Sequence, residues 1–212
     1  SQVSANKDAG FSIVKWPGYN TAGTTVGHGL GKQPQLIITK NLTTAASWPV
    51  FYGSAITTSA TTFTIPASTN YWLGLNDTWT YTAYTLDQQF GGQTNGSSND
   101  QMISYCWVSV SKYSKIGSYT GTAATQNITL GFKPAWVLFK ATSAGAGNVY
   151  WTIFDNKRNP VNPRDCEIYP NSIDYQYCVN RGVNFTDTGI ELLASSYPNE
   201  SGVDFIYMGL AE

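Results

Sequence analysis

The chain has 212 residues, 42% of them hydrophobic and only 12% charged, with a formal net charge of −1. That apolar content excludes a disordered tail, and the near-zero net charge gives no electrostatic basis for binding nucleic acid. No apolar run approaches the roughly 20 residues of a membrane-spanning helix, so we expect neither a nucleic-acid partner nor membrane insertion.

The first half of the chain is typical of short strands separated by turns. Residues 1–10 are polar and are expected to form an arm or linker. Residues 91–100 are rich in Gly, Ser and Asn and indicate a surface loop. Between these segments, β-favouring runs bounded by Ser, Thr, Asn or Gly predict strands at 11–16, 24–30, 35–40, 48–52, 61–65, 71–75 and 79–86.

The second half continues in the same way. A long β-favouring run at 102–118 leads into further predicted strands at 126–130, 135–141, 149–155, 167–169, 183–186, 190–194 and 205–210. No stretch shows a convincing 3.6-residue apolar period between helix caps. The sequence therefore predicts an all-β protein.

The sequence also repeats itself at a spacing of about a hundred residues. Four residues of the first half return in the second, namely Leu30, Gly31, Pro34 and Lys40 as Leu130, Gly131, Pro134 and Lys140. Two flanking matches pair Phe11-Ser12 with Tyr113-Ser114 and Tyr105-Cys106-Trp107 with Tyr207-Met208-Gly209. We expect a β-sandwich or jelly-roll-like body built from a first repeat at 11–112 and a second at 113–212. Because residues 103–118 join them without a polar spacer, the two repeats are expected to share one core.

Motifs for catalysis are mostly absent. His28 is the only histidine, and it lies between two glycines, which favours a packing or surface role. The dinucleotide, phosphate-loop and zinc-protease motifs do not occur, so we expect no enzyme, no cofactor and no metal. A glycosidase would require two carboxyl groups, for which Asp155 with Asp165 or Glu167 with Glu191 are the available pairs.

The most distinctive polar stretch is 155–165. It contains Asp155, Arg158, Asn159 and Arg164, and all three arginines of the chain fall in it or near it. Arginine binds carboxylates with two parallel hydrogen bonds, and Asp and Asn oxygens bind Ca²⁺, so a pocket for an acidic sugar or a calcium site is one interpretation. The other, which we favour, is an ion-paired loop stiffened by its prolines.

An aromatic cluster is the second candidate site. It comprises Tyr71, Trp72, Trp79, Tyr81 and Tyr84, with Asn70, Asn76 and Asp77 nearby. Aromatic faces stack on sugar rings, and Asn and Asp orient sugar hydroxyls. Strand aromatics also fill cores, which is the simpler alternative.

Two further residue types give expectations about packing. Cys106 lies in an apolar strand and is expected in the core, whereas the spacing of Cys166 and Cys178 leaves open whether they pair across a hairpin. Lys40 and Lys140 recur at matching strand ends, for which we favour protection of edge strands or a shared ion pair.

Six separated elements resemble, in the right order, a domain of tailed-bacteriophage structural proteins, especially from marine and cyanobacterial phages. They are residues 10–16, 27–34, 113–121, 131–140, 154–163 and 205–212. The resemblance covers nearly the whole chain, and such domains often form the distal part of tail fibres or appendages. It implies a virion structural or adhesion module within a homo-oligomeric appendage, for which a trimer is one arrangement.

The expected function follows from this resemblance and from a surface rich in Thr, Ser, Asn and Tyr. We expect a virion domain that attaches to host-surface glycans and contacts other virion proteins. A purely architectural module, such as a fibre spacer or capsid decoration, is the alternative, and a carbohydrate-active enzyme or its accessory module is a third. No signal peptide is visible. The chain opens Ser-Gln-Val-Ser without an initiator Met, so we expect either a processed chain or, the reading we favour, one domain of a longer polypeptide.

Overall fold

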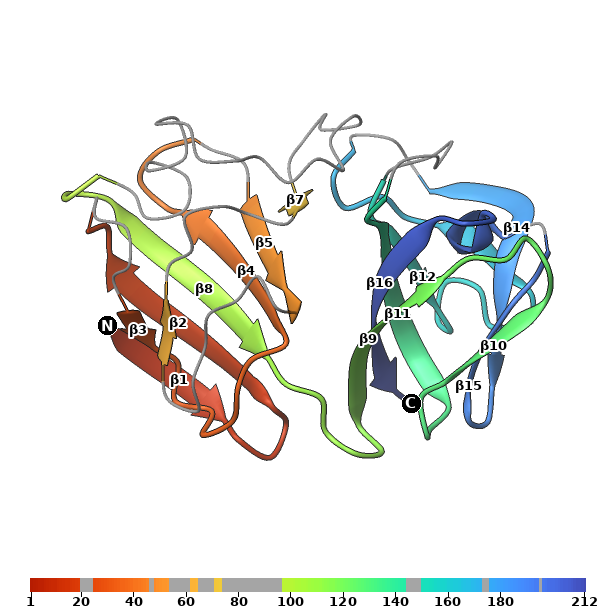
Figure 1. Ribbon diagram of the computed structural model, residues 1–212, viewed down its shortest axis with the longest axis horizontal. Helices are drawn as coiled ribbons and strands as arrows, with labels where there is room; N and C mark the ends of the chain where they lie inside the picture. Colours follow the sequence, from red (N-terminus) through yellow and green to blue (C-terminus); the bar gives the residue numbers. More distant parts are fainter. Residues whose placement is uncertain are drawn as a thin grey trace. The chain divides into compact units, whose positions relative to one another are not determined.

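The computed structural model of the protein describes residues 1–19, 25–45, 48–53, 62–64, 71–73, 97–143, 150–172, 176–194 and 196–212. The regular structure of these residues consists of β-strands and one short 3-10 helix, η4 (Tyr197–Asn199). The strands pair antiparallel in sheets (Figure 1). The all-β prediction is therefore confirmed. Within these residues, no helix has the length and apolar character needed to cross a membrane.

The chain divides into two compact units. The described residues of the first lie between Ser1 and Ser109, and those of the second between Val110 and Glu212. Each unit is considered separately below. The shared core expected for the two repeats stays a prediction.

The first unit contains a six-stranded antiparallel sheet (Figure 1). Its strands, in spatial order, are β1 (Gln2–Asn6), β2 (Phe11–Pro17), β8 (Gln101–Trp107), β4 (Leu36–Asn41), β5 (Trp48–Tyr52) and β7 (Tyr71–Leu73). A separate two-stranded sheet pairs β3 (Thr25–Gly27) with β6 (Thr62–Thr64). The 1–10 segment, expected as an arm or linker, thus carries β1, whose five residues are all exposed.

Strict alternation along β2 and β8 gives this sheet a buried face. Trp16 from β2 is 1% exposed, and its indole Nε1–H donates to Ser104 Oγ in β8 at 3.0 Å. Cys106, two residues further along β8, is fully buried, as predicted. Because successive side chains point to opposite faces of a strand, Trp16 and Ser104 lie on the same buried face. Their hydrogen bond satisfies the indole N–H, so the ring can be buried there.

We expect the Cys106 thiol to resist alkylation in the folded protein. Burial raises its pKa to about 12, a shift only partly opposed by a hydrogen bond with Ser12, so almost no thiolate exists at pH 8. Incubation with iodoacetamide followed by mass spectrometry should show no adduct on the native chain. The same reagent in urea, without reductant, should add one label per chain. Labelling of the native protein at a similar rate would contradict the burial of Cys106.

The second unit contains two four-stranded sheets. In the first, the spatial order is β12 (Thr152–Asp155), β11 (Pro134–Ala141), β16 (Asp204–Ala211) and β9 (Ser114–Thr120). In the second it is β10 (Gln126–Thr129), β15 (Gly189–Leu192), β14 (Tyr177–Thr186) and β13 (Arg164–Glu167).

The two sheets of the second unit enclose one apolar core, which makes this unit sandwich-like. Phe139 and Phe154 come from the β12-β11-β16-β9 sheet and meet edge to face, with ring centroids 6.2 Å apart. Val183, Ile190 and Leu192 come from the opposite sheet and complete the same cluster. Burial of such side chains stabilises the unit by about 1.5–3 kcal/mol each.

The two units share one order of strands. The order β2-β8-β4-β5 in the first unit is matched by β9-β16-β11-β12 in the second, so each repeat places its last strand beside its first. The cross-strand register refines the sequence match. Lys40 lies opposite Ile103, and Lys140 lies opposite Ile206. The counterpart of Tyr105 is therefore Met208, one residue beyond the match suggested by the sequence.

The prediction that Lys40 and Lys140 protect edge strands is wrong. Lys40 lies in β4, between β8 and β5, and Lys140 lies in β11, between β12 and β16. Lys140 is only 2% exposed, and the Lys40 ammonium lies 5.9 Å from the ring centroid of Trp48. An apolar stem of four carbons allows lysine to occupy such inner strands.

Two strands of the second unit begin earlier than predicted. β13 starts at Arg164 instead of residue 167, and β14 starts at Tyr177 instead of residue 183. The additional segments include Asp165, Asn180 and Gly182, residue types with low β propensity, which interrupt the strand signal of the sequence. Contacts between the strands, described below, hold them in place. The strand predicted at 79–86 lies outside the described residues.

Candidate functional site

The candidate site lies where the chain crosses from one sheet of the second unit to the other. Asp155 ends β12 and Arg164 begins β13, so the 155–165 loop joins the two layers of the sandwich. Four of the predicted site residues, Asp155, Arg158, Asn159 and Arg164, are brought together here. This proximity follows from their closeness in sequence and from the short span between the sheets.

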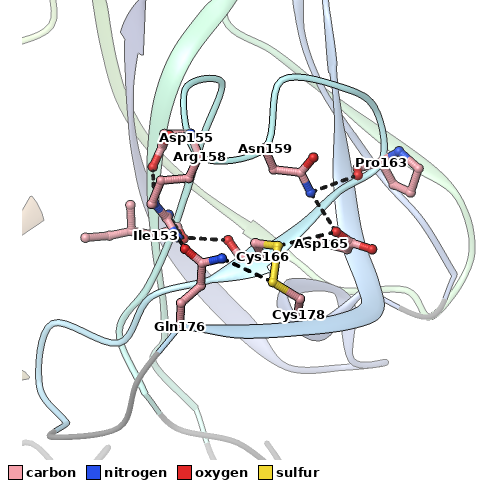
Figure 2. The surroundings of a disulfide bond; sticks show 9 residues. All are labelled: Ile153, Asp155, Arg158, Asn159, Pro163, Asp165, Cys166, Gln176 and Cys178. Atoms are coloured by element: carbon pink, nitrogen blue, oxygen red, sulfur yellow. Dashed lines mark hydrogen bonds and ion pairs between the residues drawn. A yellow bond between two sulfur atoms is a disulfide. The ribbon is translucent and has the colours of Figure 1, made fainter.

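Asp155 and Arg158 form the first half of the loop (Figure 2). Oδ1 of Asp155 accepts hydrogen bonds from the backbone N–H groups of Lys157 and Arg158 at 2.9 and 2.8 Å. Its Oδ2 accepts from Arg158 Nε at 2.5 Å. The other end of the guanidinium donates to the carbonyls of Ile153 and Cys166, both at 3.2 Å, and to Gln176 Oε1 at 3.3 Å. Arg158 therefore ties together β12, β13 and the segment that precedes β14.

The second half of the loop is fastened to the β13-β14 pair. Asn159 Nδ2 donates to Asp165 Oδ1 at 2.6 Å, and the Asn159 carbonyl accepts a hydrogen bond from Arg164. The Arg164 guanidinium lies 4.9 Å from the ring centroid of Phe185. The side-chain amide of Asn162 makes two hydrogen bonds to the backbone of Phe185: Nδ2 donates to the carbonyl at 2.9 Å, and Oδ1 accepts from the N–H at 3.0 Å. The Asn162–Pro163 peptide bond is cis.

A disulfide links Cys166 in β13 to Cys178 in β14, next to the 155–165 loop (Figure 2). The two cysteines are directly opposite partners in the β13-β14 register, with Cα atoms 4.0 Å apart. The pairing that the sequence left open is thus present. It accounts for the early starts of β13 and β14, because the covalent link holds their polar first residues together.

The charged groups of the 155–165 loop bond mainly to the loop itself and to its neighbours. The Arg158 guanidinium is bonded to Asp155 and to two carbonyls, and Arg164 is only 5% exposed, so little of either group is accessible to an acidic sugar. Asp165 Oδ1, one of the oxygens that the calcium interpretation of this stretch would use, accepts a hydrogen bond from Asn159. Among the described residues, no group of three or more His, Cys, Asp or Glu side chains could hold a metal ion. The geometry favours the ion-paired loop.

Asp155 makes stability depend on pH. Burial alone would raise the pKa of its carboxyl, but the hydrogen bonds from Arg158 and Lys157 outweigh it and leave the pKa below the ordinary value of 3.8. A carboxyl with a lowered pKa in the folded state contributes stability above its unfolded pKa, and this contribution is lost as the pH falls through the folded value. We therefore expect wild type and Asp155→Asn to differ most in unfolding free energy above pH 5 and least below pH 3. Urea unfolding across pH 2–7 measures this, and a difference independent of pH would contradict it.

Comparison with known families gives one match, a domain of unknown function (DUF7483), over residues 1–212. The chain belongs to the DUF7483 family. Comparisons with curated proteins and with solved structures find no match.

The other predicted site of this DUF7483 domain is described only in part. Tyr71 and Trp72 lie in β7, opposite Val50 and Pro49 of β5. The remaining members of the aromatic cluster and their polar neighbours lie outside the described residues. These are Asn70, Asn76, Asp77, Trp79, Tyr81 and Tyr84.

A cluster that the sequence did not predict lies on the same β13-β14 pair. The Glu167 side chain is fully buried, and its Oε2 accepts a hydrogen bond from the Tyr169 hydroxyl at 2.8 Å. Arg181 Nε lies 3.5 Å from Glu167 Oε1, and Arg181 Nη2 donates to the Tyr169 hydroxyl at 3.4 Å. The Arg181 guanidinium also lies 5.8 Å from the ring centroid of Tyr177. Residues 167, 169, 177 and 181 form what we call the Tyr177–Arg181 cluster.

Burial is the main influence on Glu167 and raises the pKa of its carboxyl, while the Tyr169 hydroxyl and Arg181 oppose this shift. Glu191, its suggested catalytic partner, lies in β15, and β14 separates β15 from β13. Strands are about 4.8 Å apart, so the two backbones are separated by about 10 Å. Glu191 Oε2 accepts a hydrogen bond from Asn184 at 2.5 Å. The only local signals for the Tyr177–Arg181 cluster were the third arginine and an acid two residues before a tyrosine.

Two features of the first unit add no candidate chemistry. His28 is fully buried, and its Nδ1 accepts a hydrogen bond from the Leu30 N–H at 3.2 Å, in line with a packing role. A surface cavity of about 360 Å³ is lined by Ser1, Gln2, Lys15, Trp16, Pro17 and Gln101. Among the described residues of this lining, Lys15 is the one charged side chain, and none carries a carboxylate.

Proposed function

We propose that this DUF7483 domain is a structural module of a bacteriophage tail fibre or virion appendage, and that it attaches the particle to host-surface glycans without catalysis. The resemblance over six sequence elements supports the virion assignment. The duplicated all-β architecture suits a rigid module of this kind, because each repeat supplies the same four-strand order.

The observation that carries the proposal is the disulfide-fastened 155–165 loop. Its carboxylates and guanidinium groups bond to one another and to the adjoining strands, so the loop is a pre-organised surface with little charge left for chemistry. A surface fixed before binding loses less entropy when a ligand arrives. Rigidity combined with local charge compensation favours binding over catalysis.

The disulfide also supports a location outside the host cytoplasm. Disulfides persist in oxidising surroundings such as virion surfaces and are rare where thiols are kept reduced. The Cys166–Cys178 link joins β13 to β14. These strands carry several charged residues, so apolar contacts alone would hold them together less well than the covalent link does. A virion appendage, exposed after release from the cell, fits this chemistry.

The proposal is tested by assembling the biotinylated domain on streptavidin and measuring its binding to lipopolysaccharide, peptidoglycan and whole cells from a panel of bacteria. We expect the tetramer to bind at least one preparation roughly 100-fold more tightly than the monomer, because shallow sites gain from multivalency. Binding should change little between 50 and 300 mM salt, since the domain carries a net charge of only −1. A tetramer that binds no preparation would count against host attachment.

A purely architectural module is the second candidate, and strand β1 favours it. All five residues of β1 are exposed, and none of Gln2–Asn6 is charged or a proline, so its sequence has neither of these two protections of an edge strand against pairing with another chain. A stable homo-oligomer in analytical ultracentrifugation, together with no glycan binding by the tetramer, would favour this reading over adhesion.

A further inference from the structure

The second unit carries a partly exposed aromatic ring beside a partly exposed guanidinium. Tyr177 is 43% exposed, and the Arg181 side chain is 37% exposed. The guanidinium lies 5.8 Å from the centroid of the Tyr177 ring, within the range of a cation–aromatic contact. The ring and the exposed part of the arginine side chain are thus presented together to solvent.

Glu167 compensates the charge of this arginine from inside the protein. Its side chain is fully buried, with Oε1 3.5 Å from Arg181 Nε and Oε2 bonded to the Tyr169 hydroxyl. Arg181 Nε and Glu167 Oε1 are both buried and face each other as an ion pair. This side of the guanidinium is therefore closed to solvent and held in place from inside the protein.

The guanidinium is therefore held in one orientation, and the exposed part of the side chain is available to a ligand. Nε faces Glu167 and Nη2 faces Tyr169, which fixes the plane of the group. Tyr169 is itself held by stacking on Tyr150, with ring centroids 4.8 Å apart. A planar donor fixed in this way, next to an exposed aromatic face, matches the two requirements of sugar recognition, namely stacking on the ring and hydrogen bonds to hydroxyls.

We propose that the Tyr177–Arg181 cluster is a binding site for a neutral pyranose, with the Tyr177 ring stacking on the sugar and Arg181 donating to its hydroxyls. The internal charge compensation selects neutral over acidic sugars, because a ligand carboxylate would lie near the buried Glu167. This inference rests on the proposed glycan attachment and names the surface that would carry it.

The test uses the arginine side chains as reporters. The chain has only three arginines, Arg158, Arg164 and Arg181, so three Nε–Hε signals are expected in a ¹⁵N-labelled sample. Hexasaccharides of glucose and of N-acetylglucosamine serve as neutral probes, and hexagalacturonate serves as the acidic one. We expect a neutral probe to shift the Arg181 signal and to leave Arg158 and Arg164, which are bonded within the loop, unchanged. No shift with either neutral probe, or a shift with the acidic probe alone, would overturn the proposal.

A matched pair of tyrosine variants tests the stacking partner. Tyr177→Ala should weaken binding of the neutral probe about tenfold, whereas Tyr113→Ala, which removes a ring that is 48% exposed in the same unit, should leave it unchanged. Arg181→Lys keeps the charge opposite Glu167 and should also weaken binding. Equal binding by wild type and Tyr177→Ala would overturn the site. If the streptavidin tetramer of Tyr177→Ala still bound bacterial envelopes as wild type does, the proposed attachment would stand and this site would fall.

Discussion

Replacing both Cys166 and Cys178 with serine is expected to lower the free energy of unfolding of the second unit by about 3 kcal/mol. The two cysteines are twelve residues apart, and closing a loop of that length removes about 3 kcal/mol of conformational entropy from the unfolded chain. The native sheet loses little by the change, because β14 remains paired with β15 as well as with β13. Urea unfolding at pH 7 under oxidising conditions measures the difference.

The wild-type protein provides the control. Dithiothreitol should lower the stability of the wild type to that of the double serine variant and should leave the variant itself unchanged. Cys106, which is buried and unpaired, remains in both proteins and does not affect the comparison. A double variant as stable as oxidised wild type would show that the link is not formed in solution or does not constrain the unfolded chain.

Loss of the Arg158 side chain has the second largest expected effect. Arg158→Ala removes the ion pair with Asp155 and three further hydrogen bonds, to Ile153, Cys166 and Gln176. Asp155 is only 16% exposed, so its carboxylate would be left partly buried without its main partner. Hydrogen bonds to charged groups contribute about 1.5–3 kcal/mol, and the partial exposure of the pair reduces their sum. We expect a loss of about 2–3 kcal/mol in urea unfolding.

Two variants separate geometry from charge in this prediction. Arg158→Lys keeps the charge but has no planar fork, so it should recover less than half of the lost stability. Lys157→Ala removes the neighbouring cation, whose side chain is exposed, and should change stability by less than about 0.5 kcal/mol. Equal losses in Arg158→Ala and Lys157→Ala would mean that the loop is not held by the contacts of Arg158.

These two predictions bear on the proposed function through the rigidity of the 155–165 loop. The disulfide fixes β13 against β14, and Arg158 fixes both against β12. The Tyr177–Arg181 cluster lies on the same strand pair, since Glu167 is opposite Tyr177 in the register. Loss of either fastening is therefore expected to weaken sugar binding as well as stability, whereas Tyr177→Ala should weaken binding alone.

The amino-acid sequence by itself determined the elements whose signals are local. Side chains alternate between faces of a strand with a period of two, so β2 and β8 could be predicted from the pattern of apolar residues. The duplication was also visible, because the turn that contains Pro34 returns with Pro134. The ion-paired character favoured for the 155–165 loop was foreseeable too, since Asp155 and Arg158 are only three residues apart.

Only the tertiary structure decided how distant residues are paired. The partners of Cys166 and Glu167 depend on which strand lies beside β13 and in which register. The local pattern of apolar and polar residues predicts neither property. Lys40 and Lys140 were misjudged for the same reason, because whether a strand is an edge or an inner strand is set by the order of the whole sheet. Composition and periodicity reflect local backbone preferences, whereas the Tyr177–Arg181 cluster exists only because the sheet brings four separated side chains to one place.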